Sequence, residues 1–312
     1  MYLCPLIKKH AIMKKYAFLL ALAAVLAVSF SSCKPDDEIY NPKCKISKIW
    51  YYSNSDWDHP DVTFLYGKGG VLDSIRLDST ASFVFGYNKD KTVSNIVNAQ
   101  PDYTEVIEIT YTDRLVDKMV YKVDDVVRKE ITFTRDEETT RITKIEEVYD
   151  KEFYESFMYQ KKSKLYNTFL GDADAAHEWI QRVPTKDLMV HCTKIVTYDP
   201  GEKKKYENIS KIEEFYPNLN QEIIHTYTYD METYNPYYGL QYAYADMSGY
   251  YVNNVLKEQQ TVKTNGVQTK YVEYTYDYSG ENFINKKKYP RQFTRTSSEN
   301  NIPRNIYILY VK

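Results

Sequence analysis

Apolar and polar residues alternate along most of the chain, and this period of two is the pattern of half-buried β-strands. A strand through Ile109 places Glu108 on the opposite face, and a strand through Phe133 does the same with Thr132. Residues 270–277 alternate in the same way. One apolar and one polar face is typical of antiparallel sheets. We therefore expect Ile109 and Phe133 in the core, with Glu108 and Thr132 exposed.

The predicted strands also recur as a sequence repeat. An aromatic residue leads into a polar turn, which is followed by a branched residue, two spacers and Ile or Met; Tyr66, Tyr87 and Tyr111 open three consecutive copies. Residues 142–149 and 209–216 are near duplicates, ITKIEEVY and ISKIEEFY. One period has the length of a β-hairpin, whose single apolar face must be buried against neighbouring hairpins. The fold class predicted is all-β, a repetitive antiparallel meander of hairpins.

The repeat is interrupted once. Residues 151–189 include a segment that is ambiguous between strand and helix, and then a short helix that Asp172 would cap and Pro184 would end. We interpret this part as a helical insertion or hinge between two sets of hairpin repeats, 46–150 and 190–312.

The N-terminal part is typical of a secretion signal. Residues 17–28 are apolar without interruption and follow two lysines; they are too few to cross a bilayer as a helix, which takes about 20. Two serines and then Cys33 come next, and this resembles the lipobox of bacterial lipoproteins. The resemblance implies that residues 1–32 are removed and that Cys33 is lipidated; the alternative is an ordinary signal peptide with an incidental cysteine. Met13 is a better start than Met1, since MKKYAFLL is a typical opening of such signals.

Residues 33–45 are predicted to be an acidic tether. Asp36, Asp37 and Glu38 resemble the surface-export signal of Bacteroidetes-type lipoproteins, while a solvated charged linker is the alternative. After removal of residues 1–32, the chain carries 37 basic and 43 acidic residues, a net charge of −6.

Composition excludes several classes of protein. The full chain of 312 residues has a net charge of −2, so it lacks the basic surface of a nucleic-acid-binding protein. Ten glycines and eleven prolines exclude a collagen-like chain. Besides the lipidated Cys33, the processed chain keeps Cys44 and Cys192, and the sequence leaves open whether these two pair outside the cytosol or stay as buried thiols.

Sequence motifs for catalysis are missing. There is no nucleophile elbow, no phosphate-binding loop and no dinucleotide fingerprint, and the His177-Glu178 pair lacks the second histidine of a zinc protease. His191 and His225 lie in strand-like runs and are interpreted as packing residues. The loop 55–61 contains three aspartates without EF-hand spacing, which favours a polar turn over a calcium site. We expect no catalytic residue, no metal and no cofactor.

Tyrosine density identifies the best candidate for a binding surface. Nine tyrosines occur between positions 227 and 251, and aromatic faces with hydroxyl groups suit sugars or peptides. The NPYYG turn is expected to lift Tyr237 and Tyr238 into solvent, and Tyr242 with Tyr244 would share one side of a strand. The alternative is that these rings only pack in the sheet.

The Tyr-Asp pairs at 198–199, 229–230 and 276–277 resemble the YD repeats of Rhs-type proteins. The chain departs from that family because the Gly-Arg after the turn is absent and the chain is too short for an encapsulating shell. It is more similar to uncharacterised Bacteroidetes lipoproteins with YD-like repeats, through residues 227–240 and most of residues 46–312. This resemblance implies a fold and a compartment, but no activity.

Together these features predict a cell-envelope lipoprotein, lipid-anchored in the outer membrane and facing the cell exterior. Its expected role is non-catalytic, in structure or in binding a glycan or peptide. The rival hypothesis is an extracellular, glycosidase-like hydrolase, which two or more acids converging in a deep pocket would favour.

Overall fold

The structure is a computed structural model. It describes residues 44–51, 58–77, 81–153, 163–170, 189–199, 208–238 and 252–311. The chain divides into two units, Met1–Asp37 and Glu38–Lys312, and all described residues belong to the second. The predicted signal peptide, the lipidation and export residues (Cys33, Asp36, Asp37, Glu38) and two of the predicted binding tyrosines (Tyr242, Tyr244) lie outside the described residues.

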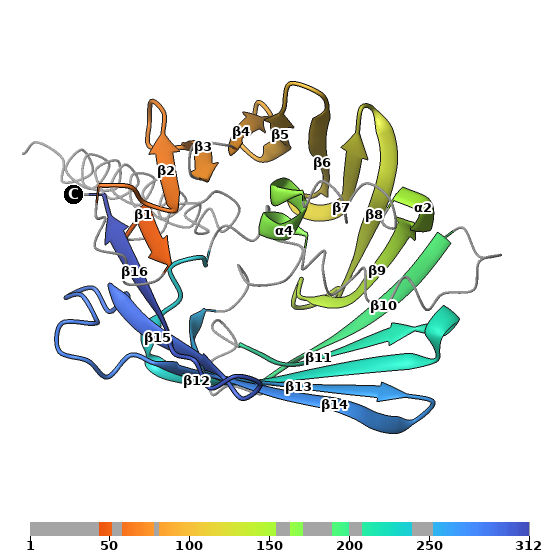
Figure 1. Cartoon of the computed structure of the whole chain (residues 1–312). Helices are drawn as coiled ribbons and strands as arrows, with labels where there is room; N and C mark the ends of the chain where they lie inside the picture. The colour runs from red at the N-terminus through yellow and green to blue at the C-terminus, as the bar shows by residue number, and fades with distance from the viewer. Residues whose placement is uncertain are drawn as a thin grey trace, which may run out of the picture. The chain divides into compact units, whose positions relative to one another are not determined.

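Sixteen antiparallel strands close into one barrel, in which each strand pairs with its neighbours in sequence and β1 pairs with β16 (Figure 1). The first eight strands are β1 (Ile46–Tyr51), β2 (Val62–Tyr66), β3 (Leu72–Leu77), β4 (Ala81–Tyr87), β5 (Val93–Ala99), β6 (Thr104–Thr112), β7 (Leu115–Val123) and β8 (Val126–Arg135). The other eight are β9 (Ile142–Asp150), β10 (Met189–Tyr198), β11 (Ile209–Tyr216), β12 (Gln221–Tyr234), β13 (Asn253–Thr264), β14 (Val267–Asp277), β15 (Gln292–Ser297) and β16 (Arg304–Tyr310).

The predicted all-β meander is confirmed, and the structure adds that the sheet is a single closed ring. Two short helices, α2 (Lys151–Phe153) and α4 (Lys164–Phe169), are described between β9 and β10, and a 3-10 turn, η2 (Pro217–Leu219), follows β11. β9 pairs directly with β10. The sheet is therefore continuous across the segment that we interpreted as an insertion or hinge.

The two faces of the wall have the composition that the alternation predicts. Ile109 and Phe133 are buried, at 4% and 5% exposure. Thr132 is exposed, and the side chain of Glu108 is 46% exposed where it pairs with Lys122. The predicted burial of these positions is confirmed. Several further ion pairs join neighbouring strands on the outer face: Lys118–Glu130, Lys257–Glu273 and Lys263–Glu222.

Tyrosine hydroxyls link successive hairpins, and this gives the repeated aromatic residue a structural role. The hydroxyl of Tyr66 donates to the carbonyl of Ile46 at 2.7 Å, and that of Tyr111 donates to the carbonyl of Val93 at 2.8 Å. The same bond, from a tyrosine to a carbonyl 15 to 23 residues earlier, is made by four others: Tyr87, Tyr229, Tyr278 and Tyr310. We call these six residues the tyrosine ladder. Each member bonds to the backbone of the preceding hairpin.

α4 lies inside the ring of strands (Figure 1). Phe169 makes edge-on contact with Phe83, at 5.4 Å between ring centroids, and Tyr166 does so with Tyr121 at 5.7 Å. Ser163 caps the helix, because its Oγ accepts a hydrogen bond from the backbone N–H of Tyr166. The first turn of α4 is thus held against the inner wall.

The cap is itself anchored by a buried carboxylate. Glu105 of β6 accepts hydrogen bonds from the hydroxyl of Ser163, the hydroxyl of Tyr121 and the amide of Asn98. These partners satisfy a carboxylate that is completely buried. At the other end of α4, Lys129 donates to the carbonyl of Leu170 at 3.3 Å. The position of α4 is therefore set by polar contacts at both ends.

Candidate functional site

A cavity of about 300 Å³ lies against the inward-facing side chains of β1, β2 and β3. Its wall is made by those strands, two residues of α4 and one tyrosine after β12: Ile49, Tyr51, Val62, Phe64, Ile75, Leu77, Asn167, Thr168 and Tyr237. The volume is at the lower end of the range for small-molecule sites, roughly 300 to 1,000 Å³. Most of this wall is apolar, so the cavity suits a small molecule with an apolar body.

Two phenols supply polar groups to this wall. Tyr51 ends β1 and Tyr237 follows β12, and the two side chains are hydrogen-bonded. Burial raises the pKa of Tyr51, yet 41% of the Tyr51 surface remains accessible to solvent. A ring that is surrounded by protein but still accessible is one that lines a cavity. At neutral pH the Tyr51 hydroxyl is protonated and can donate or accept a hydrogen bond.

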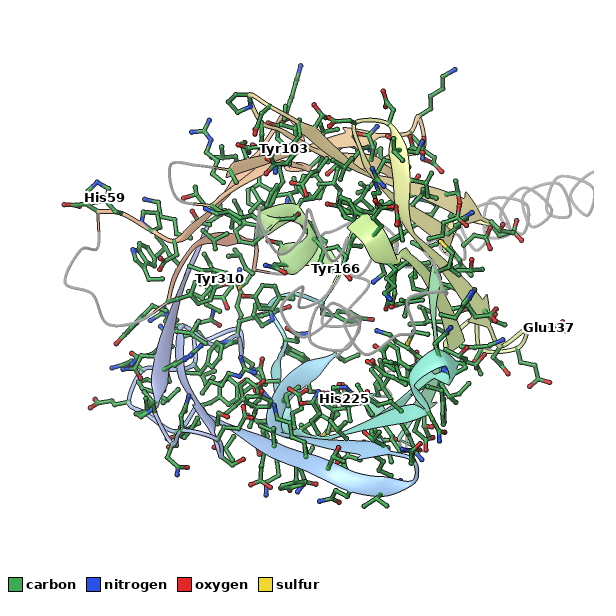
Figure 2. The ribbon with its side chains drawn as sticks, turned by 45° about the vertical axis from the view of Figure 1, so that its right-hand side comes forward. His59, Tyr103, Glu137, Tyr166, His225 and Tyr310 are labelled. Carbon is green, nitrogen blue, oxygen red and sulfur yellow. The ribbon has the colours of Figure 1, made fainter. Side chains whose placement is uncertain are left out.

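The backbone at Tyr51 is fixed by the acidic loop. Its N–H donates to a carboxylate oxygen of Asp61 at 2.6 Å. Asp58 and His59 are exposed, and His59 points away from the ring of strands in Figure 2; the rest of that loop, including Asp56, lies outside the described residues. The described part of the loop thus holds the end of β1 beside the cavity.

The NPYYG segment places its tyrosines differently from the sequence prediction. The turn forms: the Asn235 side chain accepts from the N–H of Tyr237 at 3.0 Å. However, Asn235 and Pro236 are buried, and Tyr237 and Tyr238 are half-buried rather than lifted into solvent. The reason is that the turn packs against the barrel and directs Tyr237 to the interior cavity. Of the four predicted binding tyrosines, the structure brings Tyr237 to a cavity.

A second interior feature is a row of ionisable side chains, one from each of six consecutive strands. We call it the interior charge belt, and it consists of Lys129 (β8), Glu147 (β9), Lys194 (β10), Glu214 (β11), His225 (β12) and Glu258 (β13). Successive members are 3.2, 3.2, 3.4, 3.5 and 3.3 Å apart. Figure 2 shows His225 on the inner side of the ring, as it does Tyr166, while Glu137 is outside.

Charge neutralisation allows this belt to be buried. The side chains of Lys129 and Glu147 are each 1% exposed. Burial raises the pKa of Glu147, but Lys129 and Lys194 outweigh that effect and bring this pKa down to about 2. Burial lowers the pKa of Lys194, whereas Glu147 and Glu214 raise it well above its ordinary value. Glu147 and Lys194 are therefore both ionised at neutral pH.

Neither the belt nor the cavity was found from the sequence, although a signal for the belt was present. Lys129 lies on the same face of its strand as the buried Ile131 and Phe133, and Glu147 lies on the same face as the buried Ile145. A charged residue on the buried face of a strand needs a partner inside the protein. His225 was interpreted as a packing residue; it lies instead between two carboxylates.

Other candidate groups are accounted for within the described residues. Cys44 and Cys192 are both buried free thiols. No group of three or more histidine, cysteine, aspartate or glutamate side chains is placed to hold a metal ion in the part of the chain that is described. In the same residues, no helix is long and apolar enough to cross a membrane.

Comparison with known proteins gives structural neighbours only. No protein-family model matches the chain, and no curated protein matches it. A porin-like protein from Bacteroides vulgatus has a TM-score of 0.37 at 10% identity, covering 86% of this chain and 99% of that chain. Chains of TcdB2-TccC3 and of TcdB2-TccC3-Cdc42 have TM-scores of 0.32 and 0.35 at 11% and 12% identity.

The chain covers only a small part of the TccC3-containing chains. The matches take in 78% and 80% of this chain but 13% and 12% of those chains. All of these TM-scores lie below 0.5 and all identities below 25%, so the function of this barrel is argued from its own residues.

Proposed function

We propose that the protein is a cell-envelope lipoprotein whose barrel binds a small, mostly apolar molecule in the cavity between Tyr51 and Tyr237. The cavity is the observation that carries this proposal. Barrels with filled interiors leave no such space, whereas barrels that hold a ligand do. Inside this barrel α4 packs against β4 and β7, and the cavity lies between α4 and β1 to β3.

The wall chemistry favours an apolar ligand over a glycan or peptide. Five of the lining residues are aliphatic or phenyl side chains from β1, β2 and β3: Ile49, Val62, Phe64, Ile75 and Leu77. Sugars and peptides carry many polar groups, and each of these loses free energy if it is buried without a partner. The two phenols and the polar residues of α4 suit a ligand with one or two polar groups.

The rival hydrolase hypothesis requires two carboxylates that are available to a substrate. Glu214 and Glu258 do converge inside the barrel, but they hold opposite ring nitrogens of His225, at 3.5 and 3.3 Å. Glu214 also accepts from Tyr216, and Glu258 from Tyr276. Among the nine residues that line the cavity there is no carboxylate. This arrangement supports binding rather than hydrolysis.

Filling the cavity tests the proposal. Leu77 lines the cavity and is half-buried, so Leu77→Trp should occupy the space with little disturbance of the core. Thermal unfolding of the wild type and of Leu77→Trp is measured in the presence of a panel of small aromatic and aliphatic amides. Compounds that raise the Tm of wild type should fail to raise that of Leu77→Trp.

The matched control is Val84→Trp, at a residue of β4 that is 52% exposed. It should keep the response of wild type. The cavity would be refuted as the binding site if no compound raises the Tm of wild type, or if the compounds raise the Tm of Leu77→Trp as much as that of wild type.

For location, we propose that Cys33 carries the lipid and that Asp36, Asp37 and Glu38 direct the protein to the cell exterior. The exposed ion pairs on the outer wall support a barrel surrounded by water, because barrels that span membranes carry an apolar band there. Replacing the three acids with Ala should protect the protein from protease added to intact cells. If proteolysis is unchanged, these three acids are not an export signal and form only a charged linker.

A further inference from the structure

Basic side chains gather at one end of the barrel, on the side where β1 begins. We call six of them the basic rim: Lys68 in the turn before β3, Lys89 and Lys91 in the turn between β4 and β5, and Lys286, Lys288 and Arg291 in the loop before β15. All six residues are exposed, and none forms an ion pair with any residue that the structure describes. By contrast, several lysines of the outer wall pair with acids on neighbouring strands, as Lys118 does with Glu130. The rim therefore carries positive charge that the fold does not neutralise.

Contacts around the start of β1 bring these segments to the same part of the barrel. The side chain of Lys45 donates to the carbonyl of Gly70 at 2.5 Å, in the turn before β3. The amide of Asn285, in the loop before β15, lies 3.8 Å from the sulfur of Cys44. The turn between β4 and β5 belongs to the next hairpin, because β4 pairs with β3. The basic rim is thus continuous from the loop before β15, across the start of β1, to β4.

The local charge of this part of the barrel is positive. Lys45 and residues 67–73, 88–91 and 277–291 contain eight basic and four acidic residues, a net charge of +4. The turn between β8 and β9, at the same end of the barrel, has the opposite character, with three acids at 136–138. Figure 2 shows Glu137 across the ring from Tyr310, which pairs with the first residue of β1. The near-neutral charge of the whole chain thus conceals two separate patches of opposite sign.

The basic rim lies where the chain enters the barrel from the proposed lipid anchor. Cys44 comes eleven residues after Cys33, and a chain of that length spans at most about 40 Å. Residues 34–43 between them add two lysines and three acids, which leaves the local balance positive. A lipid on Cys33 therefore holds the rim near the membrane surface, so that attraction between the two is effectively intramolecular.

We propose that the basic rim is the face with which the barrel contacts the membrane, and that its partner is the anionic phosphate head groups of the leaflet that holds the lipid. Each lysine or arginine beside an anionic membrane contributes roughly a fivefold factor in binding. This inference rests on the proposed location and adds the face and the chemistry of the contact. Repulsion of the acidic turn at 136–138 tilts the barrel toward its basic side.

The test maps the reactivity of lysines in the membrane-anchored protein. The lipidated protein, purified from cells, is added to preformed vesicles of phosphatidylcholine with or without phosphatidylglycerol. An amine-acetylating reagent and peptide mass spectrometry then report the reactivity of each lysine. Lys68, Lys286 and Lys288 should react at least about fivefold more slowly on the anionic vesicles than on the neutral ones. Added salt should remove this difference, because it screens exposed charges.

Lysines at the opposite end of the barrel are the matched controls. Lys263 and Lys270 flank the turn between β13 and β14, their side chains are 33% and 51% exposed, and both should react equally on the two kinds of vesicle. Lys286→Gln combined with Lys288→Gln should restore most of the reactivity of Lys68 on anionic vesicles. Lys263→Gln combined with Lys270→Gln removes the same charge from the other end and should leave Lys68 protected.

The outcomes separate this inference from the lipid anchor. Protein that does not float with neutral vesicles would refute the anchor, and this inference with it. Protein that floats with both kinds of vesicle but shows equal lysine reactivity on them would overturn the rim as the membrane face and leave the anchor in place. Equal protection of Lys263 and Lys270 would overturn it as well, because the attraction would then be general. Protection of the rim by soluble dextran sulfate, without protection on anionic vesicles, would overturn it and assign the rim to a soluble polyanion.

Discussion

At the scale of single residues, the tyrosines have two separate roles. Members of the tyrosine ladder donate to backbone carbonyls at the start of the preceding hairpin, as Tyr111 does to Val93. Tyr237 instead lines the cavity beside Tyr51. Six tyrosines thus join hairpins, while Tyr51 and Tyr237 line the interior cavity.

Removing one hydroxyl from the ladder should cost measurable stability. Tyr111→Phe leaves the ring in place but deprives the carbonyl of Val93 of its donor. We expect a loss of about 1 to 2 kcal/mol in the free energy of unfolding. Tyr271→Phe, at a residue 46% exposed, should lose less than about 0.5 kcal/mol. Denaturant titration measures both, and equal effects would count against the ladder.

Truncation of the two faces of a strand should have unequal effects. Ile109→Ala or Phe133→Ala removes a buried side chain and should cost about 2 to 5 kcal/mol. Thr132→Ala removes an exposed one and should cost less than about 1 kcal/mol. Urea denaturation of the three variants gives these differences. A Thr132 variant as unstable as the other two would place the strand in the opposite register.

At the scale of elements, the interior charge belt joins six strands through side chains as well as backbone. Its most buried part is the pair of Lys129 and Glu147. A buried pair is costly to break, because the remaining charge is left without compensation. The belt therefore makes the packing of β8 to β11 sensitive to the ionisation of one carboxylate.

This sensitivity predicts a specific loss of stability in acid. The pKa of Glu147 is lowered to about 2 in the folded protein from an ordinary 4.5. A lowered pKa contributes stability above pH 4.5, and this contribution is lost as the pH falls toward 2. Unfolding free energy measured from pH 7 to pH 2 should decline in that window. Glu147→Gln should be less stable at pH 7 and show a flatter decline.

The neighbouring Glu146 gives the matched control. It is exposed and pairs with Lys144 on the outer face, so Glu146→Gln should reproduce the wild-type decline. A Glu147→Gln profile parallel to that of wild type would show that the acid loss comes from other groups.

At the scale of the whole molecule, the alternation of apolar and polar residues predicts the strands and the buried face of each strand, whereas strand register and the orientation of turn side chains require the three-dimensional structure. The burial of Ile109 and Phe133 follows from the sequence because side chains in a strand alternate between faces with a period of two. The pairing of β1 with β16, Ile49 opposite Ile308, does not, because register between distant segments depends on how all other strands tilt. The orientation of Tyr237 likewise depends on the packing of a turn against the barrel.

Membrane attachment is the prediction that concerns the complete chain. The apolar run before Cys33 and the two preceding serines indicate lipidation at that thiol. Labelling of cells with an alkyne fatty acid should mark the wild-type protein, and Cys33→Ala should remain unlabelled. Equal labelling of both proteins would exclude Cys33 as the lipidated residue.

The most direct test of the binding account locates a ligand inside the barrel. Crystals soaked with 4-bromophenylacetamide, an aromatic amide of the kind used in the thermal unfolding test, and measured at the bromine absorption edge report the position of one atom of the probe. We predict an anomalous peak in the cavity between Tyr51 and Tyr237. Bromine found only on the outer wall, or an interior without a peak while the surface is occupied, would contradict it.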